Sequence, residues 1–120
     1  MEIKIGMDGD FVIAELSGDL VAGTAEQFKE QMSKLMEKNF LNVVLELSKV
    51  TFMDSSGLGS CMAAHKAFNE KKGILVCTRP SETVAKVFRV TRADQKLNMA
   101  ANRLEAVLFL QNAVLSGRQA

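Results

Sequence analysis

The sequence has few of the residues that build catalytic, metal or disulfide-linked sites. Its 120 residues include one histidine, two cysteines and one proline, and no tryptophan or tyrosine. Cys61 and Cys77 lie in apolar surroundings without a Cys-x-x-Cys motif, which favours buried thiols of a cytosolic protein over a disulfide framework. The acidic residues are scattered and the histidine stands alone, so we predict neither a metal site nor a cofactor.

Long hydrophobic runs are also missing. No apolar run approaches the roughly 18 residues of a membrane span, and the start, MEIKIGMDGDF, lacks the basic residues and apolar core of a signal peptide. We therefore expect cytoplasmic localisation and no membrane contact. With 48% hydrophobic residues the chain is long enough to bury a core, and we expect residues 1–120 to form one domain.

The charge is nearly balanced, but it is unevenly distributed. A net charge of +1 argues against a dedicated nucleic-acid binder. Residues 1–54 carry ten acids and five Lys or Arg, a net of −5, whereas residues 55–120 carry four acids and ten Lys or Arg, a net of +6. If folding separates these halves, the polarity favours orientation of a charged protein partner; the other interpretation is two solvated faces.

The first half of the sequence predicts a hairpin, a helix and a buried strand. The β-type runs IKIGM and FVIAELSG are joined by Asp8-Gly9-Asp10, a typical hairpin turn. Thr24 with Gln27 fits a capping box, which predicts a helix from there to about Asn39. NVVLELSKV then predicts a largely buried strand, and a helical pattern follows over residues 55–72.

The second half predicts a crossover architecture. ILVCT is a short buried strand, Pro80 introduces a helix, and KLNMAA is a candidate edge strand. Asn102 with Glu105 begins the last helix, which Gly117 ends. The predicted core face of that helix consists of Leu104, Val107, Leu108 and Leu115. The fold class is therefore α/β, a mixed sheet of four to five strands covered by about four helices.

The stretch TFMDSSGLGS places small polar residues where a strand gives way to a helix. The sequence argues against a serine hydrolase, because the only histidine, His65, lies ten residues after Ser55, roughly 15 Å along a helix. Gly57 and Gly59 form a lone G-x-G, a weak signal for nucleotide binding, because Met62 replaces the third glycine and no Gly-Lys-Ser/Thr occurs.

Helix-terminus chemistry remains. Asp54 is a natural N-cap, with Ser55 and Ser56 at the first two helical positions. Gly57 and Gly59 remove side chains from this turn, so another molecule can approach closely. The positive end of the helix dipole tolerates a phosphoserine at its start. The simpler alternative is that DSSG only caps the helix.

These residues carry a family resemblance. Residues 41–91, LNVVLELSKVTFMDSSGLGSCMAAHKAFNEKKGILVCTRPSETVAKVFRVT, resemble a STAS domain of the anti-sigma factor antagonist family. The upstream stretch VIAELSGDLVAGTAEQFKEQM is similar to the family's G-[ED]-L-x-x-x-[ST]-A segment. The resemblance covers nearly the whole chain and implies a STAS-type fold. Val21 and Glu46 depart from residues common in the family, with a predicted effect on the partner-facing surface.

The resemblance implies partner switching rather than enzyme activity. In this family an unphosphorylated antagonist binds an anti-sigma factor that is a GHKL-type serine kinase. The kinase phosphorylates the serine after the motif aspartate, here Ser55, and the anti-sigma factor is released. A PP2C-type phosphatase then restores binding. The expected partner-binding residues are Met53, Asp54, Ser56, Gly57, Leu58 and Gly59. The alternatives are a STAS module that binds a nucleotide or another anion at this helix start, and a scaffold in another signalling pathway.

Overall fold

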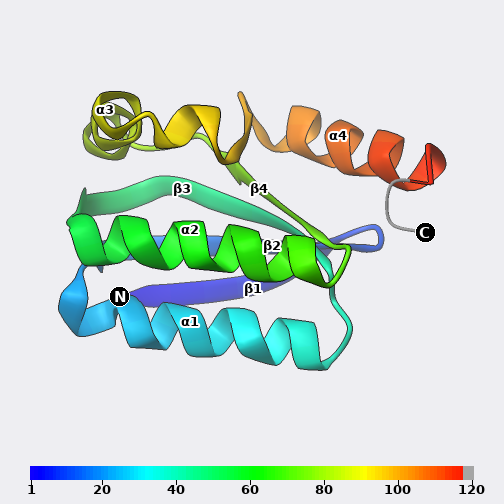
Figure 1. Cartoon of the computed structure of the whole chain (residues 1–120), viewed down its shortest axis with the longest axis horizontal. Coiled ribbons are helices and arrows are strands. Elements are labelled where there is room, and N and C mark those ends of the chain that lie inside the picture. Colours follow the sequence, from blue (N-terminus) through cyan, green and yellow to red (C-terminus); the bar gives the residue numbers. More distant parts are fainter. Residues whose placement is uncertain (118–120) are drawn as a thin grey trace.

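The computed structural model describes residues 1–117. Within these residues the chain forms one mixed sheet with the strand order β1-β2-β3-β4-β5, in which β1 is antiparallel to β2 and the other neighbours are parallel (Figure 1). The strands are β1 (Glu2–Asp8), β2 (Phe11–Leu20), β3 (Asn42–Met53), β4 (Ile74–Thr78) and β5 (Asn98–Ala100). The helices are α1 (Ala22–Glu37), α2 (Ser55–Glu70), α3 (Glu82–Thr91) and α4 (Arg103–Leu115), with a short 3-10 turn at Ala93–Gln95. The predicted α/β class is confirmed.

The hairpin between β1 and β2 closes as the turn residues predict. Asp8 lies opposite Phe11, and Gly9 between them has a φ of 61°, a left-handed conformation that glycine adopts without steric cost. The hairpin places β1 at the edge of the sheet and β2 beside the central strand β3.

Helix α1 begins earlier than its sequence predicts. Its N-cap is Val21, and Thr24 lies in the first turn, where its hydroxyl oxygen accepts a hydrogen bond from the Val21 N–H at 3.0 Å. The same hydroxyl donates to the Asp19 carbonyl at 2.7 Å. The predicted capping box of Thr24 and Gln27 is therefore wrong, because Thr24 is the third residue of the helix and the Gln27 side chain donates to the Met1 carbonyl instead. The first-turn amide of Ala22 is held by a carboxylate from elsewhere in the chain.

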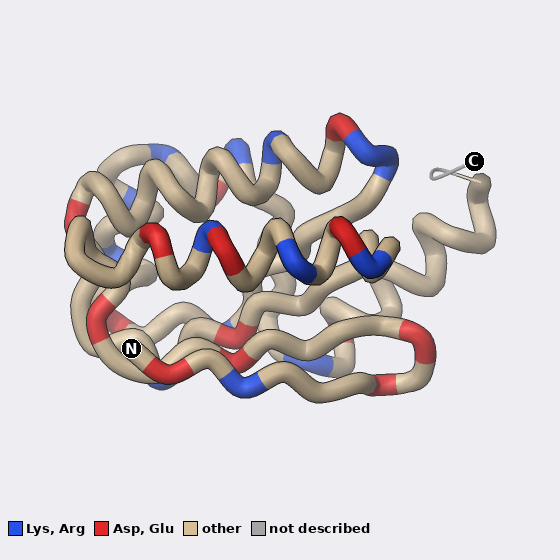
Figure 2. Tube along the Cα trace, turned by 90° about the horizontal axis from the view of Figure 1, so that it is seen from below, with Lys and Arg blue, Asp and Glu red and all other residues tan. Residues whose placement is uncertain are grey.

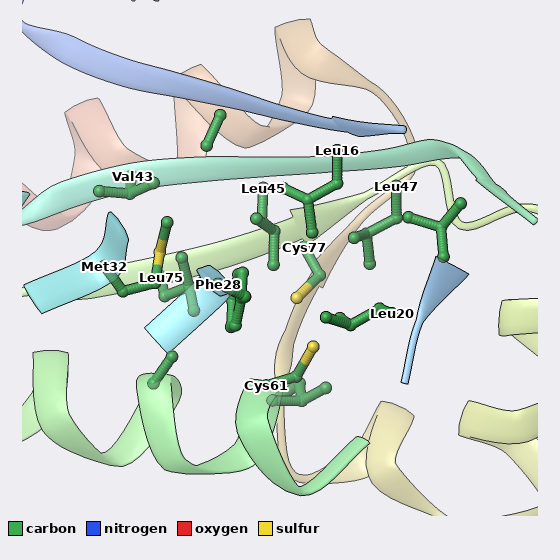
Figure 3. Close-up of a cluster of buried hydrophobic side chains, with 14 of the residues drawn as sticks. Leu16, Leu20, Phe28, Met32, Val43, Leu45, Leu47, Cys61, Leu75 and Cys77 are labelled. Atoms are coloured by element: carbon green, nitrogen blue, oxygen red, sulfur yellow. The ribbon is translucent and has the colours of Figure 1, made fainter. Parts of the chain in front are cut away.

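The larger core lies between the sheet and helices α1 and α2. Leucines of the three inner strands, among them Leu16, Leu45 and Leu75, pack against Phe28 of α1 and against α2 (Figure 3). The two cysteine thiols, at positions 61 and 77, point toward each other in this core and are free rather than disulfide-bonded. This layer holds the start of α2 firmly against the ends of β2 and β3.

Helix α4 covers the opposite face of the sheet with a different set of side chains from the predicted one. Its buried residues are Ala106, Val107, Leu110 and Ala113. Leu104, Leu108 and Leu115 are 69%, 47% and 84% exposed, so the predicted core face is wrong for three of its four members. The helix is apolar nearly all round, so periodicity does not select a face, and the two small alanines allow it to approach the sheet closely.

The strand order follows the chain order. Residues 1–54 therefore supply strands β1 to β3 toward one edge of the sheet, and residues 55–120 supply β4 and β5 at the other edge. Acidic residues mark the ends of the β1–β2 hairpin, whereas α1 carries both signs along its exposed face (Figure 2). Strands β4 and β5 carry no charged residue, so the sheet itself does not separate the two signs of charge.

Candidate functional site

Asp54 connects the starts of two helices. It follows the last residue of β3 and is the N-cap of α2, where its Oδ1 accepts a hydrogen bond from the Gly57 N–H at 2.8 Å. Its Oδ2 accepts a second hydrogen bond from the N–H of Ala22, the first residue of α1, at 3.1 Å. The predicted N-cap is confirmed, and the bond to α1 is a contact that the local sequence pattern does not reveal.

These hydrogen bonds favour the charged form of the carboxylate. The pKa of Asp54 lies below its ordinary value, chiefly because the Gly57 N–H donates to it and with a further contribution from the Ala22 N–H; partial desolvation opposes the shift. The negative charge also lies where the positive ends of the α1 and α2 dipoles meet. Asp54 therefore organises the site as a carboxylate that is already hydrogen-bonded.

The space beside Gly57 is filled by another segment of the chain itself rather than left open for another molecule. The glycine is buried, and a Cβ added at this position would overlap the Leu20 carbonyl and lie 3.1 Å from Met53 Cγ. The same Leu20 carbonyl accepts a hydrogen bond from the Asp54 N–H at 3.4 Å. The prediction that Gly57 opens the turn to a partner is therefore wrong, because β2 occupies that space.

The remaining motif residues are accessible. Ser55 and Ser56 are exposed in the first turn of α2, and Leu58 is half-buried. Gly59 is exposed, and a Cβ added there would meet nothing within 4 Å. The structure thus brings Ser55, Ser56, Leu58 and Gly59 together on one accessible helix start, held in place by Asp54.

Met53 is buried, whereas its neighbour Phe52 is exposed. Met53 is only 2% exposed and packs in the core against Gly57, so the prediction that its side chain contacts a partner is wrong. Phe52, one residue earlier on β3, points to the other face and is 50% exposed. The exposed aromatic side chain beside the helix start was missed by sequence reasoning. Simple strand alternation from the buried Val50 would bury Phe52, but the pairing of β2 with β3 shifts register between Gly18 and Asp19 and interrupts that alternation.

Nucleophilic catalysis has no structural support at this site. Helix α2 runs without interruption from Ser55 to Glu70, so His65 lies roughly 15 Å farther along its axis, and Asn69 lies within hydrogen-bond distance of its Nε2 at 3.2 Å. Across residues 1–117 no group of three His, Cys, Asp or Glu side chains is placed to hold a metal ion. None of the helices in this range is long and apolar enough to cross a bilayer.

The two departures from the family pattern lie in different environments. Val21 is the N-cap of α1, next to the amide that Asp54 binds, and is half-buried. Glu46 is 7% exposed within the sheet, with its Oε1 3.8 Å from the Arg79 Nε. The expectation that Glu46 alters a partner-facing surface is therefore wrong, whereas Val21 adjoins the site.

Both the sequence and the fold are similar to those of known proteins. The model of the STAS domain family matches residues 2–106. The anti-sigma-B factor antagonist of Listeria monocytogenes is 30% identical over 91 residues, which cover 76% of this chain and 79% of that protein. A Thermotoga maritima crystal structure superposes with a TM-score of 0.84 at 24% identity, covering 91% of this chain and 94% of the other. The Bacillus cell fate determinant SpoIIAA in its phosphorylated form superposes with a TM-score of 0.67 at 23% identity, covering 88% and 96%. The chain therefore belongs to the STAS domain family, and its curated relatives are anti-sigma factor antagonists.

Proposed function

We propose that this chain is an anti-sigma factor antagonist that works by partner switching in the bacterial cytoplasm. In its unphosphorylated form it binds an anti-sigma factor that is also a GHKL-type serine kinase. The kinase transfers phosphate to Ser55 and the complex dissociates, and a PP2C-type phosphatase restores the binding form. In this scheme the chain is a substrate and binding partner, and it catalyses no reaction itself.

The observation that carries the proposal is the position of Ser55. Its side chain is exposed at the first position of α2, while the Gly57 amide of that turn is already bound by Asp54. A kinase can reach the hydroxyl without unfolding the helix. The helix dipole stabilises an anion at this end by about 0.3–1 kcal/mol, so the fold tolerates the added phosphate.

The effect of the phosphate is expected at the binding surface. Phosphate adds about −1.5 to −2 charges, next to the carboxylate of Asp54. A partner docked on the exposed side chains of Phe52 and Ser56, on the half-buried Leu58 and on the open backbone at Gly59 would have to desolvate this charge. A coupling of about 1–3 kcal/mol is sufficient to change partner affinity roughly 5–150-fold.

The relatives support the coarser part of the proposal. The curated proteins that the chain resembles are anti-sigma-B and anti-sigma F factor antagonists. SpoIIAA, which has the same fold, is known in unphosphorylated and phosphorylated forms. The identity of the phosphoacceptor in this chain and the chemistry of its partner are the parts that an experiment must test.

The test is a phosphosite map. The protein is incubated with ATP and the GHKL-type serine kinases of its own organism, and its intact mass and tandem mass spectra are recorded. We expect one added phosphate on Ser55, none on a Ser55→Ala variant, and unchanged phosphorylation of a Ser56→Ala variant. Phosphate on Ser56 alone, or only outside residues 51–60, contradicts the assignment. No phosphorylation, together with a saturable heat of nucleotide binding, would favour the ligand-binding alternative.

A further inference from the structure

Strand β1 presents an open edge with apolar side chains. It pairs with β2 on one side, and no other strand within residues 1–117 pairs with its outer side. Ile5 and Met7 are 40% and 50% exposed, and the strand follows the margin of the molecule beside α1 (Figure 2). In an antiparallel ladder alternate residues direct their N–H and C=O groups outward. An edge of this length is therefore a template for another strand.

The side chains of β1 are self-complementary in one antiparallel register. If Gly6 lies opposite Gly6 of a second copy, then Lys4 lies opposite Asp8 of that copy, and Ile5 lies opposite its Met7. Each of these pairs occurs twice, because a two-fold axis passes between the two glycines. The charged pairs lie on one face of the extended sheet and the apolar pairs on the other, since successive side chains alternate.

We propose that β1 pairs with β1 of a second copy in this register, which joins two sheets into one. Charge selects this register over its neighbours. In the register with the two-fold axis at Ile5, Glu2 lies opposite Asp8 of the second copy. In the register with the axis at Lys4, the two copies of Lys4 lie opposite each other. Like charges directly opposite each other are destabilising. Within the strand the Gly6 register pairs opposite charges, and its like-charged pair, Glu2 with Asp10 of the second copy, involves a residue of the hairpin turn beyond the end of β1.

The pairing leaves the start of α2 accessible. The beginning of β1 lies beside the end of β2, where Glu2 is opposite Ser17, and the end of β2 leads to the Asp54 site. Antiparallel pairing places the beginnings of the two β1 strands at opposite ends of the joined sheet. The two Ser55 side chains are therefore far apart, and this dimer presents two separate binding sites. The inference does not depend on the proposed function.

The test is sedimentation velocity over a range of protein concentrations, with charge-reversal variants. The unmodified chain is expected to show a concentration-dependent monomer–dimer equilibrium. Lys4→Asp is expected to weaken the dimer by about tenfold, because two pairs change at once. Asp8→Lys should do the same, although it also removes the exposed ion pair of 3.6 Å between Asp8 and Arg103. The double variant Lys4→Asp/Asp8→Lys restores the charge pairs and is expected to recover the original dimerisation constant within about twofold.

A cysteine placed at the two-fold axis gives a second readout. A Cβ at Gly6 meets nothing within 4 Å, so Gly6→Cys is expected to fold and to form a covalent dimer on mild oxidation. The matched control is Gly23→Cys, at an equally open and exposed position in α1, which should run as a monomer on non-reducing gels. The native cysteines are buried and do not interfere.

Two outcomes overturn the inference. The first is a chain that stays monomeric at all concentrations, and the second is a dimer that Lys4→Asp leaves unchanged. In the second case, loss of the dimer in a Leu108→Lys variant would assign the contact to the exposed leucines of α4. Recovery of the dimer in the double variant, with a covalent dimer of Gly6→Cys only, supports the pairing of β1 with β1.

Discussion

Asp54 accepts a hydrogen bond from the backbone N–H of Ala22, at 3.1 Å and across 32 positions of sequence. This bond ties the first residue of α1 to the cap of α2, so one carboxylate serves two helix starts. Ser55 follows Asp54 directly, and its position therefore depends on both helices. A partner that docks on this turn meets a surface that is ordered before binding, which lowers the entropic cost of association.

Removing the Asp54 carboxylate is expected to loosen both helix starts. Asp54→Ala loses both acceptors and should lower the Tm more than Asp54→Asn, which keeps one oxygen for the Gly57 N–H. Thermal unfolding followed by circular dichroism measures the two shifts. Equal Tm values for the two variants would contradict the double role of the carboxylate.

The same carboxylate should make stability depend on pH in the acid range. Its pKa is lowered in the folded state, so its contribution is fully present above the ordinary aspartate pKa of about 4 and is lost as the pH falls through the lowered value. The native protein is therefore expected to lose more stability on acidification than Asp54→Asn, whose side chain does not titrate. Urea unfolding of both proteins at neutral pH and at acid pH measures this difference.

The two glycines of the motif are expected to respond in opposite ways to alanine. Gly57→Ala places a methyl group on the Leu20 carbonyl and should reduce the free energy of unfolding by about 1–3 kcal/mol or more. Gly59→Ala meets open space inside a helix and should raise it by about 0.5–1 kcal/mol. If Gly59 lies under a docked partner, the same stabilised variant should bind the partner more weakly. Chemical unfolding and titration calorimetry separate these two effects.

Phe52 and Met53 form a matched pair at the end of β3. Met53→Ala removes a buried side chain and is expected to cost about 2–5 kcal/mol of stability. Phe52→Ala removes a half-exposed ring, so its stability should change by only about 0.5 kcal/mol. If the ring contacts the anti-sigma factor, the affinity of this variant should fall by about fivefold or more. Unchanged affinity would remove Phe52 from the proposed docking surface.

The two cysteines should be inert in the folded protein. Burial raises the pKa of Cys61 to about 12 and the pKa of Cys77 well above its ordinary value, so neither forms the reactive thiolate near neutral pH. Iodoacetamide is expected to label neither thiol in the native state and both in guanidinium chloride, as mass spectrometry can show. Rapid labelling of either thiol without denaturant would indicate local opening of the core between α2 and β4.

The features predictable from the sequence depend on short separations along the chain. The cap of α2 by Asp54 involves an amide three residues away, and the hairpin depends on Gly9 in a two-residue turn. Both are local signals, and both are confirmed. The buried face of α1 also follows from the helical spacing of its apolar residues, because Ala25 and Phe28 lie on one apolar stripe between polar neighbours.

The features that the sequence did not predict depend on tertiary contacts or on an ambiguous pattern. The bond between Asp54 and Ala22 and the close approach of Leu20 to Gly57 join segments more than 30 residues apart. Nothing local marks them, so Gly57 resembled an opening for a partner. On α4 the apolar residues surround the helix, and only packing on the sheet decides that Leu110 is buried while Leu108 is exposed.

The central claim is that phosphate on Ser55 releases the partner, and the most direct measurement is calorimetric titration of the anti-sigma factor kinase with defined forms of this chain. The forms are unmodified protein, protein phosphorylated at Ser55, and Ser55→Ala and Ser55→Asp variants. We predict tight binding of the unmodified protein and of Ser55→Ala, with Ser55→Asp weaker and the phosphorylated form weaker by roughly 5–150-fold. Equal affinity of the unmodified and phosphorylated forms would contradict the account.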